Sequence, residues 1–275
     1  MILVTGATGA LGALIAERLS GRDDVVLGTR DPERVRGPLP VRTVDFDEPR
    51  TLTEGFTGVD VLLLISAGYG EDDTVIARHS AAIDAAEKAG VGHIVYTSLS
   101  ADGDHLPYAL PHRWTERRLR RSTAGWTILR NGLYAELLAF LATPSQDGRV
   151  TAPLGDGRLA AVARADLADA AVRVVTEAPL HANRVYELVG EEAIGGADLA
   201  EAYGPHVMYA PVTLAQARAH IAGSGAEPFQ VPMLVGTCST IAAGFMDRIG
   251  SELRELLGRA PRPALDIIRG GGREN

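Results

Sequence analysis

The chain has 275 residues and a formal net charge of −8, with 46% hydrophobic and 23% charged residues. This length can bury a sizeable core as one large domain, or as a main domain with a smaller one. The acidic balance disfavours nucleic acid or an anionic membrane as the main partner. The longest apolar run, Val59 to Ala67, is interrupted by Asp60 and is too short to cross a bilayer, and no basic-then-apolar leader precedes the first apolar run. We therefore expect a cytoplasmic protein without a membrane partner.

Cysteine and histidine give no support to a disulfide or a metal site. Cys238 is the only cysteine, which excludes an internal disulfide and a thiolate cluster. Its neighbours, Gly-Thr-Cys-Ser-Thr, include no base, so we expect a buried and idle thiol. The seven histidines form no H-x-x-x-H or H-E-x-x-H pair, so no metal is expected.

The first dozen residues read as a strand, a tight turn and a helix. Ile2 to Val4 are apolar, glycines follow at 6, 9 and 12, and a helical pattern begins at Ala13. Gly6 permits a sharp exit from the strand, Gly9 lets the backbone approach a diphosphate, and Gly12 lets the helix pack closely on the strand. A purely structural turn would show the same spacing. The place of the turn at the chain start, and the lack of a Gly-Lys-Ser/Thr ending, favour a dinucleotide at the helix N-terminus.

Short apolar strands alternate with helical stretches through the first half of the chain. The expected strands lie near 2–5, 24–28, 41–44, 60–65, 92–97 and 126–130, and the expected helices near 10–20, 49–55, 72–89 and 111–122. This alternation predicts an α/β fold with a doubly wound parallel sheet, Rossmann-like, which places its ligand at the carboxyl ends of the strands.

The pattern changes after Tyr134. We expect a helix to about 142, a Pro/Gly-rich segment over 144–157, a helix at 165–177, a strand at 184–189 and mostly helix from 195 onward, with a frayed tail over 269–275. We predict a cofactor-binding domain over 1–142, joined in its sheet by 184–189, and a smaller, mostly helical C-terminal lobe over 143–275 that covers the substrate.

Arg30 decides between the two nicotinamide cofactors. An acidic residue at the end of the second strand would bind a ribose 2′-hydroxyl, but the strand Asp24–Thr29 leads into Arg30. A guanidinium there can pair with a 2′-phosphate, which favours NADPH over NADH. Asp31 follows at once, but Pro32 behind it indicates a turn and a helix cap.

Further strand ends add cofactor candidates. Asp45 and Phe46 end the third strand, where they would border the adenine, or Asp45 would cap the helix that starts near Pro49. Ser66 and Ala67 end the fourth strand and would run beside the middle of the cofactor, although the same small residues fit a plain strand-to-loop turn.

The usual catalytic pair of short-chain dehydrogenases is missing. Lys88 is the only lysine, and position 84 is Asp rather than Tyr, so no Tyr-x-x-x-Lys pair exists. Candidate catalytic groups are Ser98, His112 and Tyr134. Their alternatives are a loop cap for Ser98, half-buried packing for Tyr134, and a solvated pair of His112 with Glu116. A quinone suits such a site, because its reduction gives a resonance-stabilised phenolate and needs only a weak proton donor.

Several stretches together resemble the NmrA-like atypical short-chain dehydrogenase/reductases, and within them the NADPH:quinone oxidoreductase type 2 group. The matching stretches are 5–12, 62–66, 96–99, 129–136, 163–166 and 185–188. The resemblance implies an NADPH-dependent quinone reductase that lacks the Tyr-x-x-x-Lys pair. The cofactor residues that we expect, from the resemblance and the strand ends together, are Gly6, Ala7, Thr8, Gly9, Ala10, Leu11, Gly12, Arg30, Asp45, Ser66, Ala67, Thr97, Asn131, Gly132, Leu133, Tyr134, Ala135, Glu136 and Arg164.

Two alternatives stay open at this point. NmrA-like proteins include non-catalytic sensors that bind NADP and regulate a protein partner, and the acceptor could be another activated carbonyl or an enone. The segment from Gly68 to Thr74 departs from the Ser/Gln-rich loop of the resembled group, so the substrate is not fixed by the resemblance.

Overall fold

The structure is a computed structural model that describes residues 1–67, 70–142 and 144–271. It contains two compact units that alternate along the chain. Unit 1 consists of residues 1–99, 110–130 and 167–186, and unit 2 of residues 100–109, 131–166 and 187–275. The domain division expected at residue 142 stays a prediction.

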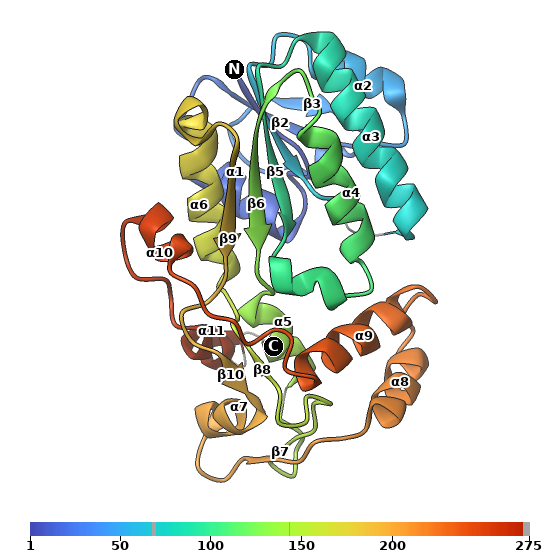
Figure 1. The fold of residues 1–275 in the computed structure, drawn as a ribbon, viewed down its shortest axis with the longest axis vertical. Coiled ribbons are helices and arrows are strands. Elements are labelled where there is room, and N and C mark those ends of the chain that lie inside the picture. The colour runs from blue at the N-terminus through green and yellow to red at the C-terminus, as the bar shows by residue number, and fades with distance from the viewer. Residues whose placement is uncertain (68–69, 143, 272–275) are drawn as a thin grey trace. The chain divides into compact units, whose positions relative to one another are not determined.

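A seven-stranded sheet forms the centre of unit 1 (Figure 1). Its order is β3-β2-β1-β4-β5-β6-β9, and the ladders that join β3, β2, β1, β4 and β5 are parallel. The strands are β1 (Ile2–Val4), β2 (Val25–Thr29), β3 (Val41–Thr43), β4 (Val61–Ile65), β5 (His93–Leu99), β6 (Gly125–Asn131) and β9 (Arg184–Leu188). The expected doubly wound fold is therefore confirmed.

Continuous apolar runs place these strands in the core, because both faces of a parallel sheet are covered by helices. Leu3 and Val4 of β1 are fully buried, as are Leu62 to Leu64 of β4. Phe56 and Tyr96 are the largest side chains in the cluster around them. At about 1.5–3 kcal/mol for each such side chain, burial here stabilises the sheet.

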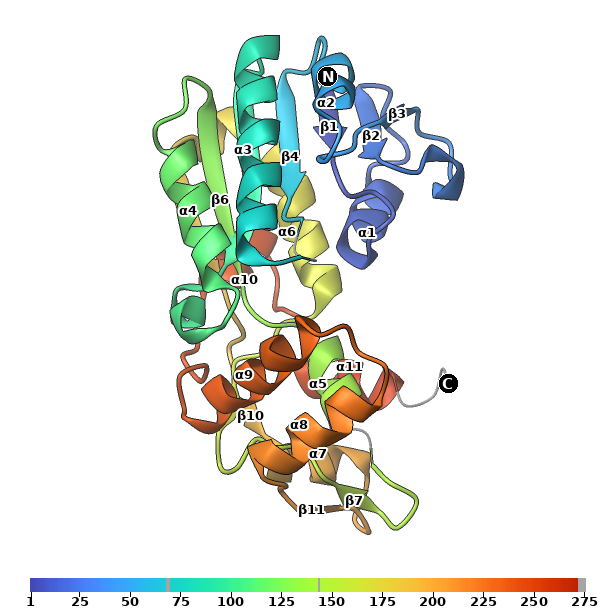
Figure 2. The ribbon, with the colours of Figure 1, turned by 90° about the vertical axis from the view of Figure 1, so that its right-hand side faces the viewer.

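Helices cover both faces of the sheet (Figure 2). The helices α2 (Pro49–Gly55), α3 (Asp72–Ala89) and α4 (Ala109–Leu119) lie on one face, and α1 (Ala10–Arg18) and α6 (Arg164–Thr176) on the other. An ion pair between Arg18 and Asp169 joins α1 to α6. The helix expected at 111–122 begins earlier, at Ala109, because Pro111 falls in the first turn, where no backbone N–H is needed.

Unit 2 combines short strands with helices. Strand β7 (Arg149–Val150) pairs in parallel with β11 (Met208–Tyr209), and β8 (Arg158–Leu159) pairs antiparallel with β10 (Ile194–Gly195). The helices are α5 (Ala135–Leu141), α7 (Gly196–Tyr203), α8 (Leu214–Gly223), α9 (Gln230–Ala242), α10 (Glu252–Leu257) and α11 (Ala264–Gly271). Of the tail expected to fray, 269–271 is helical, and 272–275 lies outside the described residues.

A buried carboxylate ties the C-terminal segment to unit 2. Asp166, in the first turn of α6, is fully buried. Its oxygens accept hydrogen bonds from Arg259 Nη2 at 2.7 Å, from the Arg262 backbone amide at 2.6 Å, and from the Arg262 guanidinium. These donors compensate a charge that would otherwise be strongly destabilising.

Neither a membrane-spanning helix nor a metal-binding cluster occurs among the described residues. Within 1–67, 70–142 and 144–271, no helix has the length and apolarity to cross a bilayer. In the same part of the chain, no group of three or more His, Cys, Asp or Glu side chains is placed to hold a metal.

Candidate active site

The carboxyl ends of β1 and β4 mark the place where ligands bind in this fold. These strands are neighbours, and the chain leaves them toward opposite halves of the sheet. Such a switch point opens a crevice at the carboxyl ends of the strands. The predicted cofactor residues of unit 1 lie in the loops after β1, β2, β3 and β4, in the first turn of α1 and, for Thr97, in β5.

The glycine turn after β1 fits a diphosphate. Gly6 has a φ of +64°, in the left-handed region that favours glycine. A Cβ on Gly12 would lie 2.1 Å from the Gly6 carbonyl oxygen, so only glycine fits the first turn of α1. Gly9 is the N-cap, and no acidic residue lies in that first turn. The positive end of the helix is therefore not neutralised locally, as an anion site requires.

Arg30 follows β2 directly, and its side chain is exposed. The next residue, Asp31, is acidic, as expected for an NADH site, but its carboxylate lies 3.9 Å from the Arg34 guanidinium. The Asp31 backbone amide donates to Thr29 Oγ1. Asp31 thus forms part of a local turn before the 3₁₀ helix Pro32–Arg34.

Asp45 shapes the loop after β3. Its Oδ1 accepts a hydrogen bond from the Asp47 amide at 3.0 Å, and its own amide donates to Thr51 Oγ1 at 2.9 Å. The alternative that Asp45 caps α2 is wrong, because Glu48 occupies the N-cap. The Asp45 carboxylate instead closes a two-residue turn, as short acidic side chains do in loops.

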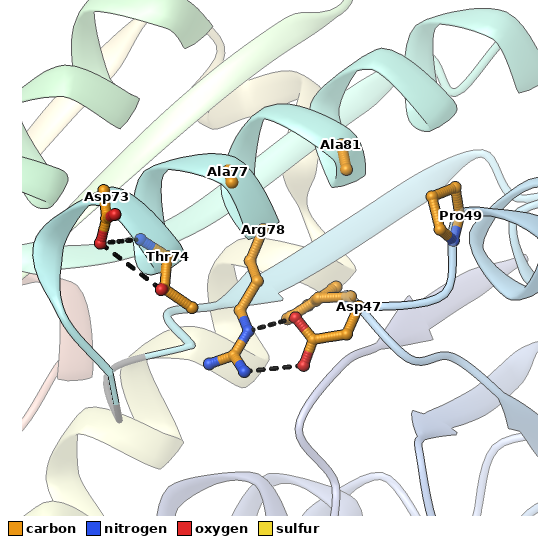
Figure 3. A pocket seen from close by; sticks show the side chains of 8 residues that line it. Asp47, Pro49, Asp73, Thr74, Ala77, Arg78 and Ala81 are labelled. Atoms are coloured by element: carbon orange, nitrogen blue, oxygen red, sulfur yellow. Dashed lines mark hydrogen bonds and ion pairs between the residues drawn. The ribbon is translucent and has the colours of Figure 1, made fainter.

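A cleft of about 410 Å³ lies between this loop and α3 (Figure 3). Its lining residues are Phe46, Asp47, Pro49, Asp73, Thr74, Ala77, Arg78 and Ala81. Arg78 holds Asp47 through two bonds, Nε to Oδ1 and Nη2 to Oδ2, both 2.7 Å. The ring of Phe46 and the small side chains of Ala77 and Ala81 give the cleft an apolar part.

The buried hydroxyl of Thr97 links β5 to the residue that follows β4. Thr97, 4% exposed, accepts a hydrogen bond from the Ser66 amide at its Oγ1. The Ala67 amide donates to His79 Nε2. The structure thus brings Ser66, Ala67 and Thr97 together at one edge of the sheet. The next two residues, Gly68 and Tyr69, lie outside the described residues. They begin the segment from Gly68 to Thr74, which differs from the corresponding loop of the resembled group.

Ser98 is bound to a buried carboxylate. Its hydroxyl donates to Glu116 Oε1 at 2.6 Å, and Glu116 is 3% exposed. Arg130 donates to the same carboxylate from Nε at 2.9 Å and Nη2 at 2.6 Å, and Arg113 donates from Nη1 at 2.8 Å. The expected solvated pair of His112 with Glu116 is therefore wrong, because Glu116 lies inside the protein among arginines.

His112 instead pairs with Tyr96. The Tyr96 hydroxyl lies 2.9 Å from His112 Nδ1, and Tyr96 is fully buried. Burial raises the pKa of Tyr96 and lowers the pKa of His112 to about 4. Both groups are therefore neutral at pH 7, and the imidazole tautomer sets which of the two donates in this hydrogen bond.

Unit 2 brings the second set of predicted cofactor residues together. The Ala135 amide donates to the Val162 carbonyl, and the Glu136 carboxylate accepts from the Arg164 amide. The Arg164 guanidinium stacks on the Tyr134 ring, 4.8 Å from its centroid. A Cβ on Gly132 would lie 3.1 Å from the Leu188 carbonyl oxygen, which explains the glycine. The structure thus brings Tyr134 and Glu136 together with Arg164. Of the other predicted residues of this set, Asn131, Gly132, Leu133 and Ala135 are buried.

Two buried polar atoms of this set are orphaned. Asn131 Oδ1 and Arg164 Nε have no hydrogen-bond partner among the described residues. Unpaired buried polar groups of this kind cost about 1–3 kcal/mol each. An acceptor and a donor held in this way fit a polar ligand such as a dinucleotide.

Cys238 is placed as the sequence indicates. It is fully buried in α9, and burial raises the pKa of its thiol to about 11. The thiol is protonated at pH 7 and so is a weak nucleophile.

The strand order, the glycine turn and the basic strand end together define a dinucleotide-binding protein of the Rossmann type. Residues 6–178 match the model of an NAD(P)H-binding family. The chain belongs to this family and, within it, to the NmrA-like atypical short-chain dehydrogenase/reductases. It is an NAD(P)H-dependent oxidoreductase.

The comparisons with known proteins agree in class. Quinone oxidoreductase 2 of Escherichia coli is 34% identical, with 94% of each chain covered. An NAD(P)H azoreductase of Xenophilus azovorans is 30% identical, with 82% of each covered. An NmrA-like family domain-containing oxidoreductase of Aspergillus flavus is 29% identical, covering 97% of this chain and 93% of that one.

Two solved structures share the whole fold. Triphenylmethane reductase of Citrobacter, complexed with NADP(H), has a TM-score of 0.90 at 28% identity. The NADPH-dependent quinone oxidoreductase of E. coli, complexed with NADPH, has a TM-score of 0.88 at 32% identity. Both alignments cover 98% of this chain and 99% of the other. The cofactors named for these complexes, NADP(H) and NADPH, agree with the expected NADPH.

Proposed function

We propose that the protein transfers hydride from NADPH to a quinone-type acceptor. The observation that carries the proposal is an arginine after β2, beside a glycine turn after β1, in a chain without a Tyr-x-x-x-Lys pair. The arginine suits a 2′-phosphate, and the missing pair suits an acceptor that needs no strong acid. The activities named for the relatives, on quinones, azo compounds and triphenylmethane dyes, support conjugated acceptors.

The diphosphate, the 2′-phosphate and the adenine of NADPH have proposed partners in unit 1. The turn from Gly6 to Gly12 binds the diphosphate, and Arg30 binds the 2′-phosphate. Phe46 and the cleft beside α3 take the adenine, while Asp45 fixes the loop that carries Phe46. The apolar part of the cleft, with an aromatic ring at its edge, supports this placement.

The orphaned atoms of unit 2 support a polar contact with the cofactor. In this assignment Asn131 Oδ1 accepts a hydrogen bond from NADPH and Arg164 Nε donates one. Tyr134 holds the Arg164 guanidinium in place by stacking.

The reaction balances with one hydride and one proton. When bound, NADPH supplies a hydrogen with its electron pair, which adds to the quinone and gives the hydroquinone anion. A proton from water or from a nearby side chain then completes the hydroquinone. Of the candidate catalytic residues, Ser98 is already bound to Glu116 and His112 is neutral at pH 7, so we assign proton donation to Tyr134.

Stopped-flow mixing of the enzyme and NADPH with small quinones tests the proposal. We expect NADPH oxidation well above the uncatalysed rate, with one hydroquinone formed for each NADPH consumed. Tight NADPH binding without oxidation by any acceptor would instead support a redox sensor. Faster turnover with enones than with quinones would assign quinone reduction to a side activity.

A further inference from the structure

Buried side chains hold the backbone where it leaves β4. The Ile65 amide donates to Thr5 Oγ1, the Ser66 amide to Thr97 Oγ1 and the Ala67 amide to His79 Nε2, each at 3.0 Å. Thr5 and His79 are fully buried, and Thr97 is 4% exposed. Three consecutive peptide groups are therefore fixed by side chains from different elements of unit 1.

His79, the partner of the Ala67 amide, forms hydrogen bonds with both of its ring nitrogens. Its Nδ1 lies 2.8 Å from Thr115 Oγ1, which itself donates to the Pro111 carbonyl at 2.7 Å. A hydroxyl has a single hydrogen, so Thr115 accepts from His79 Nδ1–H. Nε2 must then be the unprotonated nitrogen that accepts from Ala67.

The ring is held in this neutral form at physiological pH. Burial lowers the pKa of His79 to about 3. Protonation would place a hydrogen on Nε2 against the Ala67 N–H and break the contact. The neutral imidazole thus links the exit of β4 to α3 and α4 through one fixed tautomer.

We propose that His79 is a positioning residue for the cofactor, which it serves by fixing the Ala67 peptide in its binding conformation before the cofactor arrives. This inference rests on the proposed function, in which Ser66 and Ala67 border NADPH. A peptide that is already ordered does not have to be ordered on binding, so affinity rises without any new contact. Ala67 serves the part of the cofactor that NADPH and NADH share, so both should depend on His79 equally.

Two substitutions separate the contacts of the ring. In His79→Gln the side-chain oxygen reaches the place of Nε2 and keeps an acceptor for Ala67. In His79→Asn the amide nitrogen lies near the place of Nδ1 and keeps only the Thr115 contact. We expect the Asn variant to bind NADPH and NADH about tenfold more weakly, the effect of one lost hydrogen bond, and the Gln variant to stay within about twofold of wild type.

The matched control is His93, a second buried histidine paired with a threonine. Its Nε2 lies 2.8 Å from Thr127 Oγ1, which donates to the His181 carbonyl. His93 is at the amino end of β5, away from the ligand edge of the sheet. His93→Asn should lower Tm about as much as His79→Asn and leave the Kd for NADPH unchanged. If the role of His79 were purely structural, His79→Asn and His93→Asn would have the same Kd for NADPH.

The test is to measure the Kd for NADPH and for NADH by fluorescence titration, and the Tm, for each variant. Equal loss of affinity in the Gln and Asn variants of His79, or unchanged affinity in the Asn variant, would overturn the proposal. Hydrogen exchange on the wild type gives a test that no folding defect can obscure: the Ala67 amide should be protected without cofactor, and fast exchange there would refute preordering. A wild type that binds NADPH but reduces no quinone would refute the proposed function and leave these comparisons intact.

Discussion

Replacing Glu116 with Gln is expected to destabilise the protein by about 3 kcal/mol. The carboxylate is 3% exposed and accepts hydrogen bonds from Ser98, Arg113 and Arg130. Breaking a buried ion pair typically costs about 3–5 kcal/mol, and glutamine keeps the shape and one acceptor, which places the loss at the lower end. At about 2–4 °C per kcal/mol for a chain of this size, Tm should fall by about 6–12 °C in a thermal scan.

Asp24→Asn is the matched control, because Asp24 is held by Arg22 through the same Nε and Nη2 fork. Those side chains are 42% and 43% exposed, so the pair is worth less than about 1 kcal/mol. Equal losses of Tm in the two variants would refute the reasoning that burial sets the cost.

The stability that the Glu116 carboxylate contributes should depend on pH in a predictable direction. Burial acts to raise its pKa, but hydrogen bonds from Arg130 and Ser98, together with the positive charges of Arg113 and Arg130, outweigh burial and hold the pKa below its ordinary value of 4.5. This stabilisation is complete above pH 4.5 and is lost as the pH falls through the lowered pKa of the folded state. The Tm difference between wild type and Glu116→Gln should therefore narrow on acidification below pH 4.5.

Three further predictions concern Arg30 after β2, Gly12 in the glycine turn and the thiol of Cys238. Arg30→Ala should weaken NADPH binding by about 1.5–3 kcal/mol and leave NADH nearly unchanged, with Arg34→Ala as the control in the same loop; equal losses for both cofactors would contradict the 2′-phosphate assignment. Gly12→Ala should abolish measurable NADPH binding, because its Cβ would lie 2.1 Å from a carbonyl oxygen, whereas Gly21→Ala, with nothing within 4 Å, should bind normally in the same titration. Cys238 should resist thiol reagents in the native protein at pH 7 and react on unfolding, and rapid labelling of the native state would disprove its burial.

The sequence predicted the sheet well, because buried parallel strands are short apolar runs that end in glycine or polar residues. The β1 turn and Arg30 could be placed by their distance from such runs alone. The chain segments that build unit 2 carry weaker signals, since strands of two residues such as β7 and β8 bury too little to show a periodic pattern.

Side-chain partners across the sheet could not be predicted in this way. Glu116 looked like one half of a helical surface pair, and only the tertiary fold shows Arg130 facing it from β6. A signal for His79 was present, because it follows Val75 by one helical turn on the buried face of α3. Its partners, Ala67 and Thr115, come from distant parts of the chain, so its role was not readable from spacing.

The Asp166 contacts have a consequence for the synthesis of the chain. The residues that compensate this acid, Arg259 and Arg262, follow it by 93 and 96 positions. A nascent chain that has already formed α6 must keep Asp166 hydrated until the segment with Arg259 and Arg262 has left the ribosome. A chain that ends before Arg259 would bury an uncompensated charge or leave the start of α6 open. Synthesis of the segment that carries Arg259 and Arg262, rather than formation of the sheet, therefore sets the moment at which unit 2 closes.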